Sequence, residues 1–166
     1  MATSTHINPK VLELVGAIVI STQDAEKYLK IILPFTNSQD PSIRGVIARQ
    51  EKLQKRTFGD LIGRFKDSST SISNHLGQGL TELANQRNLI VHYFREAHGK
   101  NLHARNSQAV IEMLQAQLAD INKLRDMLMR LASILLEALR DTTFQGTPEY
   151  QKMHDLCAAF RQRLVG

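Results

Sequence analysis

Residues 110–140, VIEMLQAQLADINKLRDMLMRLASILLEALR, carry the strongest periodic pattern in the chain. Their apolar positions recur every three or four residues, at Val110, Leu114, Leu118, Ile121, Leu124, Leu128, Leu131 and Leu135. This spacing aligns them on one face of an α-helix. At 1.5 Å per residue the helix is on the order of 50 Å long. The stretch predicts one long helix to about Arg140, whose apolar face serves either a bundle core or a coiled coil.

Further helices are predicted on both sides of this stretch. Asn8-Pro9 supplies a capping side chain and a fixed backbone angle, which open a first helix that runs to about Leu33. The other expected helical segments are 42–55, 57–65, 76–98 and 149–163, with a polar loop over 67–74. No segment alternates in the manner of a β-strand. The expected fold class is all-α, an antiparallel helical bundle of four long helices plus short helices.

Composition places the chain among single-domain globular proteins. A length of 166 residues suits one domain spanning 1–166, and 42% apolar with 22% charged residues excludes intrinsic disorder. The longest apolar run, Val11–Ile20, is too short for the ~20 residues of a spanning helix, and no signal-peptide cleavage pattern follows it. The single Cys157 cannot form an internal disulfide. We expect a cytoplasmic protein without a membrane partner.

The net charge of +5 is concentrated in one segment. Residues 44–66 hold seven basic and two acidic side chains. Such a basic surface suits the phosphates of RNA or a nucleotide, although a solvated helix face would have the same composition. The predicted RNA-binding residues are Arg44, Arg49, Lys52, Lys55 and Arg56.

Arg87 interrupts an apolar helix face. At 100° per residue it falls inside the stripe formed by Leu80, Leu83 and Ile90. Burying an unpaired charge costs several kcal/mol, so Arg87 should meet a carboxylate, a protein interface or a phosphate. The alternative is a side chain that reaches to solvent from the edge of the stripe.

His92 follows Arg87 by five positions. On a regular α-helix it lies about 140° around the axis from Arg87, on the same side as Asn88. Glu96, one turn later, could orient the imidazole or raise its pKa. A histidine on a helix can also be purely structural.

The hexapeptide 87–92, RNLIVH, resembles the R-N-x-x-x-H signature of HEPN domains, a superfamily of small helical bundles. The likeness extends to the flanking residues 80–86 and 93–96 and to the upstream segment 57–65. The resemblance implies a metal-independent endoribonuclease, often a toxin of a toxin–antitoxin or phage-defence system. In this family Arg87 and His92 match the catalytic pair, and Asn88 matches the polar residue beside the arginine. RNA, a second copy in a homodimer and a cognate antitoxin are the implied partners.

One position departs from a subgroup of the family. Members paired with minimal nucleotidyltransferase antitoxins carry a tyrosine two positions after the histidine, where this chain has Phe94. Tyr93 is adjacent but rotated by about 100° on a helix. The superfamily also contains members that only bind or scaffold, so a non-catalytic nucleotide- or RNA-binding regulatory protein is the alternative function. A third possible function is that of a structural adaptor unrelated to nucleotides.

The expected chemistry needs no cofactor, because RNA carries its own nucleophile in the 2′-hydroxyl. His92 could remove the 2′-hydroxyl proton or protonate the leaving 5′-oxygen, while Arg87 binds the phosphoryl oxygens. The products would be a 2′,3′-cyclic phosphate and a 5′-hydroxyl. No metal is expected, since His92, His98 and His103 lack the spacing and the acidic or thiolate company of a metal site. Cys157 is expected to be an inert core thiol.

Overall fold

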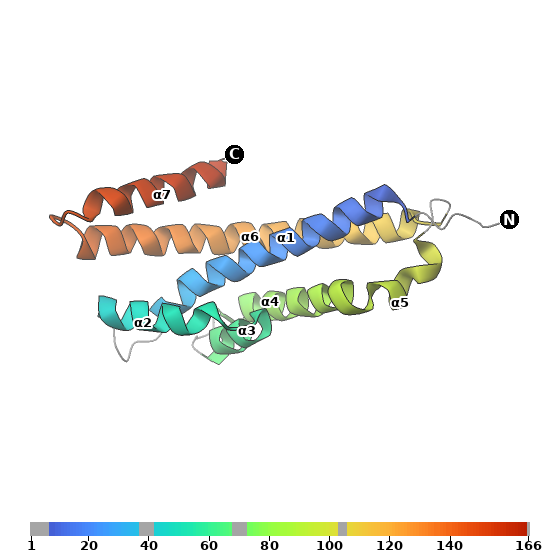
Figure 1. Ribbon diagram of the computed structural model, residues 1–166, viewed down its shortest axis with the longest axis horizontal. Coiled ribbons are helices and arrows are strands. Elements are labelled where there is room, and N and C mark those ends of the chain that lie inside the picture. The colour runs from blue at the N-terminus through green and yellow to red at the C-terminus, as the bar shows by residue number, and fades with distance from the viewer. Residues whose placement is uncertain (1–6, 37–41, 68–72, 103–105, 166) are drawn as a thin grey trace.

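The computed structural model describes residues 7–36, 42–67, 73–102 and 106–165. Helices account for nearly all of these residues, and no strand occurs among them, which confirms the all-α fold class. The α-helices are α1 (Pro9–Ile32), α2 (Ile43–Gln54), α3 (Phe58–Asp67), α4 (Ser73–Asn88), α5 (Phe94–His98), α6 (Gln108–Thr143) and α7 (Tyr150–Val165) (Figure 1). Short 3₁₀ turns follow α1 (Leu33–Phe35) and α5 (Gly99–Asn101).

Side-chain caps begin the helices where the sequence predicts. The Asn8 side chain accepts a hydrogen bond of 2.9 Å from the Lys10 amide at the start of α1. Ser42 caps α2 through the Gly45 amide at 3.1 Å, and Thr57 Oγ1 accepts from the Asp60 amide at 3.3 Å at the start of α3. Each contact satisfies a backbone donor that lacks a partner within the helix.

α1 and α6 form a parallel pair, and three polar contacts fix their register. Asn8 Nδ2 donates to Ser107 Oγ at 2.7 Å, Ser21 Oγ to Asn122 Oδ1 at 3.0 Å, and the Tyr28 hydroxyl to Met129 Sδ at 3.0 Å. The sequence separations are 99, 101 and 101 residues, a near-constant offset that only parallel helices give. The two helices run side by side in Figure 1.

The core lies where α1 meets α6, where α1 packs on α3 and α4, and where α6 packs on α4. Ile18, Leu29, Leu61, Leu80, Leu114 and Leu128 are fully buried. The apolar stripe of α6 therefore faces the core of the bundle over most of its length. Of the two predicted roles for this stripe, bundle core or coiled coil, the structure shows the bundle core.

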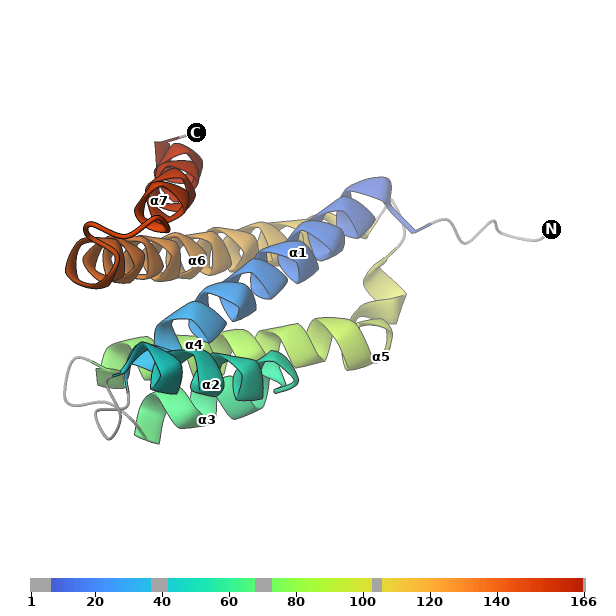
Figure 2. The same cartoon turned by 60° about the vertical axis from the view of Figure 1, so that its left-hand side comes forward.

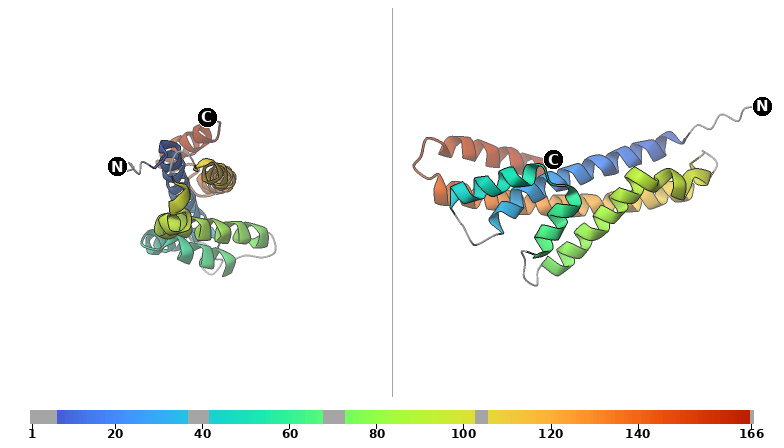
Figure 3. Two further views of the ribbon diagram at one scale, coloured as in Figure 1. Left: turned by 90° about the vertical axis from the view of Figure 1, so that its right-hand side faces the viewer. Right: turned by 60° about the horizontal axis from the view of Figure 1, so that its bottom comes forward.

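The helices form three layers. α7 lies on one side of the α1–α6 pair and packs mainly on α6, while α2 to α5 cover the other side (Figures 1 and 2). The end-on view in Figure 3 shows the same order. α4 and α7 run against α6, but the pair with the most extensive contact, α1 and α6, is parallel. The predicted antiparallel arrangement therefore does not hold for the α1–α6 pair.

Two segments differ from their predicted extent. α4 begins at Ser73, inside the expected loop 67–74, and residues 68–72 of that loop lie outside the described part. The expected regular helix over 76–98 is interrupted at residues 89–93. Farther along, Gly146 adopts a φ of 79° in the turn between α6 and α7, a conformation that favours glycine. None of the described helices carries a stretch long and apolar enough to cross a bilayer.

Candidate functional site

A π-helical turn interrupts the helix that carries the motif. Residues 89–93, LIVHY, form this turn between α4 and α5, and His92 lies within it. We refer to it as the π-turn. Its i→i+5 hydrogen bonds place more residues in each turn than an α-helix has. The rotation about the helix axis from one residue to the next is therefore smaller than the 100° of an α-helix. His92 is therefore less than 140° around the axis from Arg87, and the structure brings the two closer to one face than a regular helix would.

Arg87 and Asn88 form the amino-terminal half of the site. Arg87 is half-buried at the end of α4, and its Nη1 donates a hydrogen bond of 3.2 Å to Asn88 Oδ1. No carboxylate pairs with Arg87 within the described ranges. The guanidinium keeps most of its donors for a ligand, and Asn88 holds it at the edge of the apolar stripe.

His92 is exposed and meets an aromatic neighbour. Its ring lies 6.2 Å from the ring of Tyr93, centroid to centroid, in an edge-to-face arrangement. Phe94, the next residue, points the other way and packs against the core. The imidazole of His92 is thus open to solvent, while Phe94, which directly follows the π-turn, packs this part of the helix onto the core.

Glu96 and His98 complete the neighbourhood. Both residues lie on α5. No ion pair joins Glu96 to His92 in the described residues, and the orienting role of Glu96 stays a prediction. His98 ends α5, where its ring lies 5.1 Å from that of Phe94 and its buried Nε2 has no hydrogen-bond partner among the described residues.

The net positive charge of the chain falls in one layer of the molecule. Ten basic and five acidic residues fall between positions 43 and 101, so α2 to α5 and their connections hold the whole net charge of +5. The ion pairs of the described residues all lie elsewhere, on α1, α6 and α7. Most basic side chains on the α1, α6 and α7 helices have a carboxylate neighbour, whereas those of the described α2–α5 residues have none.

The predicted RNA-binding residues lie on α2 and the residues that follow it. Arg44, Lys52, Lys55 and Arg56 are exposed. Arg49 is half-buried, and its Nε donates to the Pro34 carbonyl at 2.8 Å, which ties α2 to the end of α1. In Figure 1, α2 and α5 lie toward opposite ends of the layer, so the structure does not bring this basic helix next to His92.

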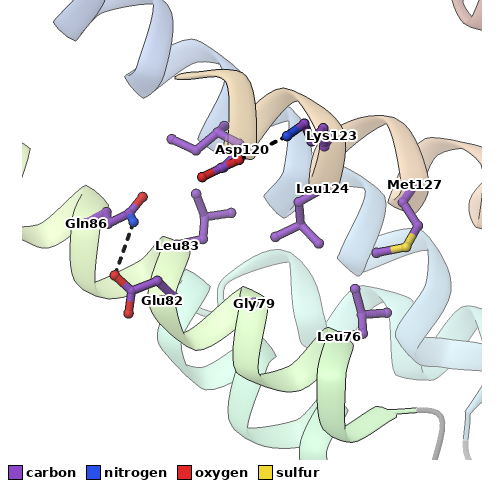
Figure 4. A pocket seen from close by; sticks show the side chains of 10 residues that line it. Leu76, Gly79, Glu82, Leu83, Gln86, Asp120, Lys123, Leu124 and Met127 are labelled. Atoms are coloured by element: carbon purple, nitrogen blue, oxygen red, sulfur yellow. Dashed lines mark hydrogen bonds and ion pairs between the residues drawn. The ribbon is translucent and has the colours of Figure 1, made fainter. Parts of the chain in front are cut away.

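An apolar groove runs between α4 and α6 (Figure 4). Its volume is about 580 Å³, and Leu76, Leu83, Leu124 and Met127 are among the apolar residues of its wall. The groove stops at Gln86, one residue before Arg87. None of the three motif residues lines it.

The sequence motif could not reveal the π-turn or the basic residues beyond it. The periodic pattern 80–94 fits a continuous α-helix, because Leu83, Ile90 and Phe94 are separated by seven and four residues, as on a regular helix face. Arg95 and Lys100 are exposed near the π-turn and unpaired within the described residues, yet they lie outside the basic segment 44–66. They follow the motif in the chain and were not among the predicted RNA-binding residues.

Two further candidates play no part in this site. No group of three or more His, Cys, Asp or Glu side chains that could hold a metal ion occurs among the described residues, and His103 lies outside them. Cys157 is buried between α7 and α6, and burial raises the pKa of its thiol while the nearby Arg140 acts in the opposite direction. A thiol with a raised pKa is a poor nucleophile.

Comparisons of this chain with protein-family models, with curated proteins and with solved structures give no match. The residues of the site and their geometry are therefore the basis for a functional assignment.

Proposed function

We propose that this chain is a metal-independent endoribonuclease of the HEPN type, which cleaves RNA through attack by the 2′-hydroxyl. The observation that carries the proposal is the π-turn, which presents an exposed His92 close behind the Arg87–Asn88 pair. π-turns within α-helices are rare and often mark functional sites. This one coincides with the motif that the resemblance singles out.

The chemistry divides between the two motif ends. Arg87, free of any carboxylate in the described residues, binds the non-bridging oxygens of the scissile phosphate and stabilises the charge that develops on them. His92 takes the proton of the 2′-hydroxyl or gives one to the departing 5′-oxygen. The 2′-oxygen then bonds to phosphorus, the bond from phosphorus to the 5′-oxygen breaks, and a 2′,3′-cyclic phosphate remains.

A second copy of the chain completes this scheme. One imidazole cannot serve as base and acid in the same step, and His92 has no hydrogen-bond partner among the described residues to fix its ring. A two-fold dimer with the π-turns facing each other supplies a second His92. The exposed apolar side chains of Leu89 and Val91 beside the motif fit such a contact.

The same resemblance extends the proposal to the biological setting. The chain would adopt a HEPN-like bundle and act in the cytoplasm as the toxin of a toxin–antitoxin or phage-defence system, with a cognate antitoxin as its partner. The exposed Tyr93 is not at the position of the modified tyrosine in the subgroup described above, so antitoxin-catalysed modification is not part of the proposal.

The reaction chemistry can be tested with the purified chain in the presence of a chelator. We expect cleavage of single-stranded RNA to continue, and we expect an oligonucleotide with 2′-methoxy groups at every position to remain intact, because it has no free nucleophile. Cleavage that stops on chelation, or that proceeds on the 2′-methoxy substrate, would overturn the proposal. Binding of RNA without any cleavage would favour the regulatory, non-catalytic alternative.

A further inference from the structure

The π-turn carries a second exposed group that the proposed chemistry does not use. Tyr93 is 56% exposed, although tyrosine has a large apolar ring that proteins usually cover. No partner for its hydroxyl occurs among the described residues. The ring meets the edge of the His92 ring, so it projects from the same turn as the motif.

The basic residues in the same stretch of the chain, on α4, α5 and the turn after α5, point to a nucleic acid. Arg87, Arg95 and Lys100 are all unpaired within the described part of the chain, and Glu96 is the acidic residue among positions 84–101. Exposed aromatic rings among unpaired cations are the pattern by which proteins bind single strands: the cations follow the phosphates, and bases stack on the rings. An apolar protein partner would not need the three cations.

We propose that Tyr93 is a stacking platform for an RNA base next to the phosphate held at Arg87 and His92. The inference rests on the proposed function, since it places the base relative to the scissile phosphate. Stacking on Tyr93 would hold one nucleotide against the π-turn while the phosphate is contacted by Arg87. The ring then positions the substrate and does not take part in proton transfer.

Binding can be measured apart from cleavage. We would use the His92→Ala chain and a short single-stranded RNA that carries one 2-aminopurine, placed at each position in turn. Stacking quenches the fluorescence of this base, so we expect strong quenching at one position. Tyr93→Leu in the same background should remove the quenching and weaken binding roughly 5- to 150-fold, the range for one base–aromatic stack. Tyr93→Phe keeps the ring and should preserve both.

A matched control comes from the opposite layer of the molecule. Tyr150→Leu makes the same change on α7, beside the neutralised Arg140–Asp141 pair, and should leave quenching and affinity unchanged. With the His92-containing chain, Tyr93→Leu should raise KM more than it lowers kcat, because a stack that forms on binding contributes equally to ground and transition states.

The outcomes separate this inference from the proposed nuclease. If the His92-containing chain cleaves RNA while Tyr93→Leu binds and cleaves equally well, the stacking role is wrong and the nuclease stands. If no RNA is cut but the quenching depends on Tyr93, the platform stands and the nuclease proposal fails. If Tyr93→Leu changes only the molecular mass in solution, the ring belongs to a protein contact and the stacking role is overturned. Absence of RNA binding would overturn both.

Discussion

At the scale of single residues, Arg87 and Asn88 act as one unit. A guanidinium at the edge of an apolar stripe could swing between solvent and core, and the hydrogen bond of 3.2 Å to Asn88 limits that freedom. The planar fork of an arginine matches two phosphoryl oxygens at once, which a lysine ammonium cannot do. The identity of the side chain at position 87 should therefore matter as much as its charge.

Substitutions at these two positions should separate charge from geometry. We expect Arg87→Ala to lower kcat on the order of 10²- to 10³-fold, as loss of a donor to a developing oxyanion does, and also to weaken RNA binding. Arg87→Lys should restore most of the binding but little of the rate. Asn88→Ala should have a milder effect than Arg87→Ala. Rates and affinities that are equal for all three variants would contradict a phosphate-binding role.

At the scale of elements, the sequence predicts most helices and misses how they pair and bend. Caps at Asn8, Ser42 and Thr57 and the break at Gly146 are local signals that can be read from the chain. The parallel register of α1 and α6 depends on contacts such as Ser21–Asn122 across about a hundred residues, which no local pattern encodes. The π-turn was also not predicted, because the apolar residues around it, Leu83, Ile90 and Phe94, have a spacing that a regular α-helix gives as well.

The attachment of α7 to α6 should depend on pH. Arg161 donates a hydrogen bond of 2.7 Å to Glu137, which lowers the pKa of this carboxyl below its ordinary value of 4.5. A lowered pKa in the folded state means that the contact stabilises α7 fully above pH 4.5 and is lost as the pH falls through the folded pKa. Both groups are partly exposed, so the effect is modest.

Hydrogen exchange of the α7 amides between pH 3 and pH 6 measures this attachment, after correction for the intrinsic exchange rate. We expect protection of α7 to fall at the acidic end while that of α1 changes less. Glu137→Gln should flatten the pH dependence, since the glutamine does not titrate. If the protection of the α7 amides in Glu137→Gln depends on pH as it does in the wild type, another group controls the attachment of α7.

At the scale of the whole molecule, the layers differ in how their charges are used. The α1, α6 and α7 helices pair most of their basic residues with nearby carboxylates, whereas no ion pair involves the basic residues of the α2–α5 layer in the part of the chain that the structure describes. An excess of five positive charges on one side of a small protein attracts a polyanion over about a Debye length, 8–10 Å at moderate salt. This side also carries the π-turn.

Charge reversal on α2 tests whether this layer binds RNA. Converting Arg44, Lys52 and Lys55 to Glu should weaken binding of all RNA sequences alike and reduce the steepness of its salt dependence. Arg49 is left intact because it bonds to Pro34. The matched control reverses Lys27, Lys123 and Lys152, which changes the net charge equally on the other helices. Equal losses in both triple variants would mean that only total charge matters.

The proposed two-fold arrangement predicts the mass of the particle. Light scattering at micromolar concentration should give about twice the chain mass of 18.7 kDa. Val91→Asp places a charge on the exposed apolar surface beside the motif and should return the monomer mass. A wild-type monomer that cleaves RNA would contradict a site shared between two copies.

The proposed proton transfer by His92 in the cleavage of RNA can be tested through the reaction products. Wild-type chain and His92→Ala are incubated with the same RNA in the presence of a chelator, and the products are identified by mass spectrometry. His154→Ala, which removes an exposed histidine from α7, is the control. We predict 2′,3′-cyclic phosphate ends from the wild type and the control and intact RNA from His92→Ala, with RNA binding retained in all three. Cleavage by His92→Ala at the wild-type rate would contradict the account.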